Sequence, residues 1–479
     1  AADETSGGGA SKSYEVGIVA KLPWPEVLQA DPHLRECVLR SVTIRKELDA
    51  SDETSPGFVA PWAKPDSSAR SVLDSRVRHY EDDVLVLVSV SADLEAAVLA
   101  GTGATDAAGF VEQEVGTHPA SYPRRRLAAA DVGGMLTAPL EQAIGEATRR
   151  KGAVRVLTQK NFVADRRIEV VAHACEVHPE SVVELRRAVG SVAPEQADEI
   201  LTGLASYLIG CAFGRWDVRI GRDPAAALPV ADDPFAPVPV CPPGMLVDPD
   251  GLPAREAPAG YRLTLTSHRL LVDEPGHPAD IVSAVEAGAG ALVDDPGALI
   301  DDLTRLLGVA DLRTYLCKRF FKDHLALYSK SRRKAPIYWP LTIPSRGWTV
   351  WLYAPALSRE ALYGAAAHTE RRWNAAEAEM RRLESAQLQA GDDAPVARSL
   401  ATRLDAARRL GEELRSLHKL LAAVAASGWQ PDLDDGIVVC ASPLADALLD
   451  WAKDPAETRA RLRAGKLDWA SAHRWREAL

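Results

Sequence analysis

The chain has 479 residues, so it has room for roughly two to four domains of about 100–200 residues each. Hydrophobic residues make up 47% of it and charged residues 26%, a composition that is typical of globular proteins and excludes a chain that is disordered throughout. With 56 Lys and Arg against 67 Asp and Glu, the formal net charge is −11, so general basicity is excluded as a basis for nucleic-acid binding.

The amino-terminal residues 1–13 begin Ala-Ala-Asp-Glu-Thr-Ser-Gly-Gly-Gly and are predicted to be a linker or the edge of a longer protein. They lack the charged leader and apolar core of a signal peptide. No apolar run approaches the ~20 residues of a membrane span, and the six cysteines form no Cys-x-x-Cys pair. We therefore expect a cytoplasmic protein with no membrane partner, disulfide framework or metal site.

Residues 14–220 are predicted to form a helix-rich domain. Its clearest helix is expected at 194–213, where apolar residues recur on one face at four- and three-residue spacing. These apolar positions are Ile200, Leu204, Leu208 and Cys211. Other helical segments are expected at Pro32–Asp49, Ser67–Leu99, Ala138–Arg150 and Ser181–Val189, with a loop at Gly101–Pro123. Residues 221–259 contain many prolines and are predicted to be an irregular connection at a domain boundary.

Residues 260–357 are predicted to form a small mixed α/β unit. Helices are expected at Asp280–Ala287, Pro296–Leu307 and Asp311–Lys330. Two short strands, Ile337–Trp339 and Thr349–Tyr353, are expected around the turn at Pro344–Gly347, because aromatic and β-branched residues flank a turn sequence.

A long helical hairpin and a short tail complete the predicted organisation. The hairpin occupies 358–427, with helices at Ser358–Gln389 and Pro395–Ala426. The tail, 428–479, is expected to contain a strand at Gly436–Cys440 and two short helices that carry Trp451, Trp469 and Trp475. The predicted fold class is α+β, predominantly helical, with a helical region, a small mixed unit, the helical hairpin and a short α/β tail.

Positive charge is concentrated between Arg313 and Lys334, where only Asp323 opposes the basic residues, and aromatic rings follow immediately. A basic stretch beside aromatic side chains is typical of a surface that binds a polyanion with stackable bases. An ordinary solvated helix face is the alternative for any single charge run. The basic residues are Arg313, Lys318, Arg319, Lys322, Lys330, Arg332, Arg333 and Lys334.

Several short strings, in a fixed order from about residue 40 to the end, are similar to the carboxy-terminal part of large adenine-specific DNA methyltransferases. These enzymes belong to the BREX and DISARM phage-defence systems and to related type II restriction–modification systems. Cys440 departs from the Asn usual in the family, and residues 84–172 match poorly. The strings are Arg45–Asp49, Glu53–Ser55, Ser206–Asp217, Arg313–Tyr315, Phe320–His324, Ser331–Trp339, Asp434–Ile437, Pro443–Leu444 and Asp468–Trp469.

The motifs for methyl transfer itself are missing from the chain. Adenine methylation requires an Asn/Asp-Pro-Pro-aromatic loop around the flipped base and a glycine-rich turn for S-adenosylmethionine. Cys241–Gly244 has the two prolines without the polar and aromatic residues, Asp248–Gly251 does not follow a convincing buried strand, and Gly7–Gly9 lies in the linker. We assign no catalytic or cofactor-binding residue. The resemblance implies the post-catalytic, target-recognition part, with S-adenosylmethionine bound by a methyltransferase core upstream or in another chain.

The predicted partner is double-stranded DNA. Basic side chains would neutralise phosphates and set the register, while Arg346 would contact a guanine edge. For Trp339 and Trp351 a core role is favoured over DNA contact, because large rings in strands usually pack inward. The predicted DNA-binding residues are Lys318, Lys322, Lys330, Arg332, Arg333, Lys334, Arg346, Tyr338, Trp339 and Trp348.

Two other classes of function stay open. A non-catalytic scaffold or adaptor would use the two long helices to bind other proteins of a defence system, and its binding would be insensitive to salt. An independent enzyme has no support, because we find no nucleophile–base pair or metal triad in a defined context. For the buried-looking residues Tyr207, Phe213, Arg215 and Trp216, tight packing between a helix and a loop is favoured over a ligand site.

Overall fold

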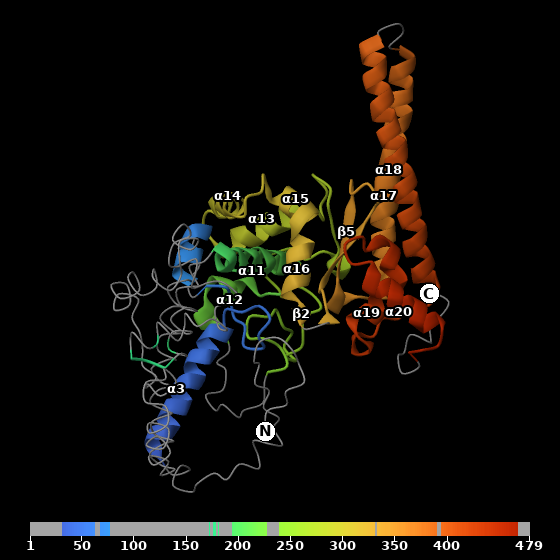
Figure 1. The fold of residues 1–479 in the computed structure, drawn as a ribbon. Helices are drawn as coiled ribbons and strands as arrows, with labels where there is room; N and C mark the ends of the chain where they lie inside the picture. The colour runs from blue at the N-terminus through green and yellow to red at the C-terminus, as the bar shows by residue number, and fades with distance from the viewer. Residues whose placement is uncertain are drawn as a thin grey trace. The chain divides into compact units, whose positions relative to one another are not determined.

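The computed structural model describes residues 31–62, 68–76, 172, 176–178, 181, 194–227, 239–330, 333–389 and 394–467 (Figure 1). The chain divides into two compact units. The first comprises residues 1–52, 72–200 and 230–238, and the second comprises 53–71, 201–229 and 239–479. The second unit continues on both sides of the predicted Pro-rich connection. The predicted linker at 1–13, the helix at 138–150, the loop at 101–123, Trp469 and Trp475 lie outside the described residues.

The described chain is mostly helical and contains a small three-stranded antiparallel sheet, which confirms the α+β class with helix predominating. In the first unit, α3 (Pro32–Asp49) matches the predicted helix. Asp31 caps it by accepting hydrogen bonds from the backbone N–H groups of His33 and Leu34, at 2.9 and 3.3 Å. Leu34, Cys37 and Ile44 are its buried residues.

Helix α11 (Pro194–Ala212) also matches its prediction. From Leu201 onward it belongs to the second unit, where Leu204, Leu208 and Cys211 are buried as expected. It ends before Gly214, which has the left-handed φ of +69° that suits a glycine after a helix. Within the helix, a Cβ on Gly210 would lie 2.4 Å from Cδ1 of Trp216, so only glycine allows the indole to approach this closely.

Three helical segments follow in the second unit. Helix α12 (Val218–Arg222) is capped by Asp217, α13 (Ile281–Leu292) by Asp280 and α14 (Pro296–Leu306) by Asp295. Short 3₁₀ turns lie at η3 (Pro224–Ala226), η4 (Ser267–Arg269) and η6 (Ala354–Ala356). The predicted basic helix consists of α15 (Leu312–Tyr315), the π-helical turn η5 (Leu316–Phe320) and α16 (Phe321–Leu327).

The last residues of the predicted basic helix form a strand, which corrects that boundary. The chain leaves helical geometry at Tyr328, and β2 (Ser329–Lys330) then pairs with β3 (Arg333–Lys334). The backbone N–H of Ala335 donates to the carbonyl of Tyr328 at 3.0 Å, which closes the small hairpin. The paired residues are only three and five positions apart, so a local hairpin ends the helix, which helical periodicity alone does not reveal.

The predicted hairpin is confirmed as β4 (Tyr338–Thr342) and β5 (Thr349–Tyr353), with Trp339 opposite Leu352. The short strand β1 (Leu271–Val272) pairs with the other side of β5, so the sheet order is β1-β5-β4 and both pairings are antiparallel. Every residue of β4 and β5 is buried. This burial on both faces explains their nearly continuous apolar sequences.

Helices α17 (Arg359–Gln389) and α18 (Ala394–Ala426) lie side by side and confirm the predicted helical hairpin (Figure 1). Leu414, Leu417, Leu421 and Val424 form part of their buried seam. Exposed ion pairs cross between the helices, including Arg403 with Glu379 at 3.1 Å and Arg415 with Glu377 at 3.0 Å.

The tail corrects one prediction. It contains η7 (Leu433–Asp435), α19 (Ile437–Ala441), η8 (Ser442–Ala447) and α20 (Lys453–Arg463). The segment predicted as a strand at 436–440 is therefore helical. The backbone N–H of Val439 donates to the carbonyl of Gly436 at 3.0 Å, and a short apolar run does not distinguish a strand from a buried helix.

Candidate nucleic-acid interface

Helices α15 and α16, with the π-helical turn between them, carry the first predicted contacts. Lys318 and Lys322 are exposed. The carboxylates of this segment have partners within it: Asp311 accepts a hydrogen bond from the backbone N–H of Thr314 at 2.6 Å, and Asp323 accepts one from Nε of Arg319 at 2.9 Å. Among the described residues, neither lysine has a carboxylate within 4.0 Å, so their charge stays available to an external anion.

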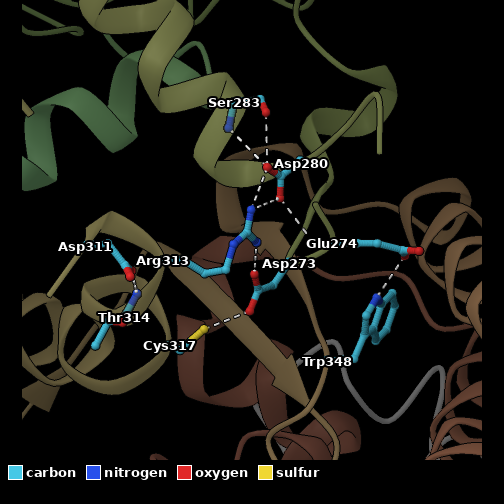
Figure 2. Close-up of polar contacts among 9 residues, drawn as sticks. All are labelled: Asp273, Glu274, Asp280, Ser283, Asp311, Arg313, Thr314, Cys317 and Trp348. Carbon is cyan, nitrogen blue, oxygen red and sulfur yellow. Dashed lines mark hydrogen bonds and ion pairs between the residues drawn. The ribbon is translucent and has the colours of Figure 1, made fainter. Parts of the chain in front are cut away.

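Arg313, by contrast, belongs to an internal network (Figure 2). Its guanidinium lies between Asp273 and Asp280, with an ion pair of 2.9 Å to Asp280 and a closer one to Asp273. Asp280 also accepts from the backbone N–H of Ser283, and Sγ of Cys317 donates to Asp273 at 2.8 Å. Arg313 therefore joins the basic helix to the start of α13, and it supplies no free charge.

The same network makes Cys317 unreactive. Burial, together with its hydrogen bond to Asp273, raises the pKa of the Cys317 thiol to about 12. A thiol with so high a pKa carries almost no thiolate at neutral pH, and the thiolate is the nucleophilic form. We assign this cysteine a packing role.

The β2–β3 hairpin brings further basic positions next to the end of α16. Lys330 pairs in register with Arg333, and Ser329 pairs with Lys334. Arg332 and the side chains of Lys330 and Arg333 lie outside the described residues. Nζ of Lys334 lies 3.3 Å from Oδ2 of Asp454, and both side chains are partly exposed. The backbone thus gathers the basic positions at one small hairpin, while Lys334 has an internal partner.

Arg346 lies at the turn between β4 and β5, with a left-handed φ of +58°. Its guanidinium donates two hydrogen bonds to the carboxylate of Asp450, at 2.8 and 2.6 Å. This contact lowers the pKa of Asp450. The neighbouring backbone N–H of Ser345 donates to Glu413 at 2.9 Å. The predicted guanine contact would therefore require Arg346 to exchange Asp450 for a base.

The predicted aromatic contacts lie in the core. Tyr338 and Trp339 are each 0% exposed, and Trp348 is 1% exposed. Nε1 of Trp339 donates to the carbonyl of Pro336 at 2.8 Å, and Nε1 of Trp348 donates to Glu274 at 3.3 Å. Because no base can reach these rings, we replace their expected stacking role with a structural one. The core role favoured for Trp339 and for Trp351, which is 3% exposed, agrees with their placement.

A buried polar cluster, which sequence reasoning did not find, joins residues far apart in the chain. One carboxylate oxygen of Glu53 accepts hydrogen bonds from three donors, all in the second unit. The donors are Oγ of Ser206 at 3.1 Å, Nη1 of Arg215 at 2.9 Å and the hydroxyl of Tyr328 at 2.6 Å. Glu53, Ser206 and Arg215 are at most 7% exposed, so the cluster holds the fold together and offers no ligand site.

Burial shifts the ionisation of the groups around Arg215. Although desolvation alone would lower the pKa of Arg215, neighbours such as Tyr328 and Glu53 raise it above its ordinary value, so the guanidinium stays charged. Burial, and then the charge of Arg215, lower the pKa of His324 well below its ordinary value. His324 is therefore neutral, and its Nε2 accepts from the backbone N–H of Ile337 at 2.9 Å. Arg215 and Trp216 are therefore packing residues, as the sequence favoured, and do not line a ligand site.

Comparisons with known proteins identify no family for the chain. No protein-family model matches it, and no curated protein is significantly similar to it. Among the residues that the structure describes, no group of three or more His, Cys, Asp or Glu side chains is placed to hold a metal ion. In the same residues, no helix combines the length and apolar character of a membrane span.

Proposed function

We propose that this chain is the DNA-recognition portion of a site-specific, S-adenosylmethionine-dependent DNA adenine-N6 methyltransferase of a bacterial anti-phage or restriction–modification system. The ordered strings from residue 40 onward support the family. The observation that carries DNA binding is the exposure of Lys318 and Lys322, for which the described part of the chain supplies no carboxylate partner, in a molecule whose formal net charge is −11.

The basic surface consists of Lys318, Lys322 and the hairpin positions Lys330, Arg332, Arg333 and Lys334. Lys318 lies in the π-helical turn η5, and Lys322 lies four residues later, in α16. Such lysines act as point charges on phosphates, which set the position of the duplex without reading its sequence. The methyltransferase core, upstream or in another chain, would bind S-adenosylmethionine and extrude the adenine. Residues of this chain would hold the duplex in register for that step.

The proposal is tested by the salt dependence of duplex binding. Each neutralised phosphate contributes about −0.9 to the slope of log affinity against log salt. Lys318→Ala with Lys322→Ala should therefore weaken binding and make the slope less negative by about 1.8. The matched control is Lys419→Ala with Lys466→Ala, which removes two exposed lysines elsewhere in the second unit. Equal losses in the two double variants, or no binding by the unaltered chain, would reject this interface.

A scaffold function is the second candidate. It is favoured by two apolar side chains of the helical hairpin that are exposed to solvent. Leu388 is 87% exposed near the end of α17, and Val396 is 45% exposed near the start of α18. Exposed apolar side chains beside a helix connection suit contact with another protein. Substituting Leu388 and Val396 by Ser would abolish salt-insensitive binding to other defence proteins if this function applies, whereas salt-sensitive duplex binding would be unaffected.

A further inference from the structure

Lys334 of the basic surface and Arg346, the predicted guanine-contacting residue, are both paired with one short acidic segment of the tail. Arg346 makes its two hydrogen bonds to Asp450, and Lys334 forms its ion pair with Asp454. Asp450 and Asp454 are only four residues apart, so their Cα atoms are at most about 15 Å apart, at 3.8 Å per residue. Residues 450–454, hereafter the acidic segment, thus present one carboxylate to each of two basic side chains, Lys334 before β4 and Arg346 after it.

We propose that the acidic segment competes internally with DNA, holding Arg346 and Lys334 until duplex phosphates displace its carboxylates. This inference rests on the proposed function, because it specifies how the same surface is regulated. A carboxylate and a phosphate are alternative partners for the same guanidinium or ammonium group. DNA must therefore replace Asp450 and Asp454 before it engages these two cations, whereas Lys318 and Lys322 need no such exchange.

The exposure of the ion pairs makes the exchange possible. The side chains of Arg346 and Asp450 are 47% and 45% exposed, and those of Lys334 and Asp454 are 45% and 33% exposed. Ion pairs in such high-dielectric surroundings contribute little net stability, and salt screens them further. A phosphate can thus replace either carboxylate without desolvating a buried charge.

The acidic segment does not depend on these ion pairs for its position. Trp451, between the two aspartates, is 3% exposed and packs against Trp339 with ring centroids 6.1 Å apart. Its Nε1 donates to Oδ2 of Asp454 at 3.0 Å. The indole therefore anchors the segment in the core, so the basic side chains can change partners while the backbone stays in place.

The test compares two double variants of the full chain in duplex binding. Asp450→Asn with Asp454→Asn removes both competing charges and keeps the side-chain shape, including an acceptor for Trp451. The control, Asp446→Asn with Glu457→Gln, also removes two carboxylates from the tail. Their partners there are Arg459, at 2.8 Å, and Lys453, at 3.9 Å, neither of which belongs to the proposed surface. Both variants change the net charge equally, so any difference reports the local competition.

We expect the Asp450→Asn, Asp454→Asn double variant to bind duplex about five- to tenfold more tightly at low salt. DNA then no longer has to break two weak ion pairs before it binds the two cations. The control should change affinity less than twofold. Adding Arg346→Ala and Lys334→Ala to the first variant should cancel the gain, because the released cations are then absent.

The other outcomes separate this inference from the proposed function. Equal tightening in both double variants would show a net-charge effect and overturn the competition. Unchanged or weaker binding in the Asp450/Asp454 variant, with the Lys318/Lys322 dependence intact, would overturn the competition alone. If neither the unaltered chain nor the Asp450/Asp454 variant binds duplex, both ideas fail. Binding that appears only in that variant would likewise fail the proposed function, because the unaltered chain would then have no DNA-binding surface to regulate.

Discussion

Two of the arginine–carboxylate pairs in the second unit are similar in length but differ in their surroundings. Arg215 and Glu53 are 2.9 Å apart with side chains 8% and 4% exposed, while Arg346 and Asp450 are 2.6 Å apart with side chains 47% and 45% exposed. The first pair lies among Ser206 and Tyr328, which supply further hydrogen bonds. The second faces solvent and can reach an external anion.

This difference assigns the two pairs different roles. A buried charge that loses its partner has no water to solvate it, so the buried pair resists exchange. A half-exposed pair loses little when one partner leaves, because water and salt replace the interaction. Burial, and not the residue types, therefore separates the arginine that maintains the fold from the arginine that is free to bind.

The largest expected effect is on the buried pair. Glu53→Gln should lower the free energy of unfolding by about 3–5 kcal/mol, because it leaves the guanidinium of Arg215 buried without a counter-charge. Urea denaturation followed by tryptophan fluorescence measures the change, since Trp216 lies beside Arg215, with the guanidinium 4.1 Å from its ring centroid. The control, Glu379→Gln, breaks the exposed pair with Arg403 and should cost less than about 1 kcal/mol. Similar costs for the two variants would contradict the distinction.

An intermediate effect is expected for the pH dependence of stability at the same buried cluster. The pKa of His324 is lowered in the folded chain, by burial and then by Arg215. Below the unfolded pKa of about 6.5, only the unfolded chain takes up the proton, so stability is fully present above this pH and falls as the pH drops. The loss should reach about 1.4 kcal/mol per pH unit.

The measurement is the free energy of unfolding between pH 7.5 and 5, compared in the unaltered chain and in His324→Gln. Glutamine retains an acceptor for the backbone N–H of Ile337 and does not titrate. The pKa of His368, which burial lowers to about 4, adds a slope that both proteins share. Asp446 and Asp450 have lowered pKa values and lose their contribution only at more acidic pH. The slope of the unfolding free energy against pH should therefore be smaller in the variant, by the amount that corresponds to one proton taken up on unfolding. An unchanged slope would show that His324 is charged in the fold.

Local patterns predicted several of the regular elements of the second unit. Helical spacing indicated α11, α17 and α18, and the aromatic strands around Pro344–Gly347 indicated β4 and β5. The errors occurred where a short segment was compatible with more than one local structure. Strand pairing decided the end of the basic helix, and local hydrogen bonding to Gly436 made α19 helical despite its strand-like composition.

The candidate interface was predicted only in part, for a different reason. Exposure of Lys318 and Lys322 agrees with their expected surface role, since charged residues on one helix face are usually solvated. The partner of Arg346 is 104 residues away in the chain, and Glu53 is 162 residues from Arg215. No spacing rule links such distant residues. Sequence could therefore identify which side chains are cationic, but not which of them already hold a carboxylate.

The smallest expected effect concerns the stability of the exposed pair. Asp450→Asn should change the free energy of unfolding at neutral pH by less than about 1 kcal/mol, because the pair is half-exposed and solvent compensates its loss. The same urea titrations measure it, with Arg346→Ala as the partner variant and the double variant completing a cycle whose coupling energy isolates the pair. A coupling of about 3 kcal/mol or more would place Arg346 with Arg215 as a residue that maintains the fold. Phosphate would then be unable to displace Asp450 cheaply, because breaking the contact would destabilise the turn between β4 and β5. A weak coupling leaves the guanidinium free to exchange one anion for another, which is the property that an exposed arginine needs in order to bind DNA.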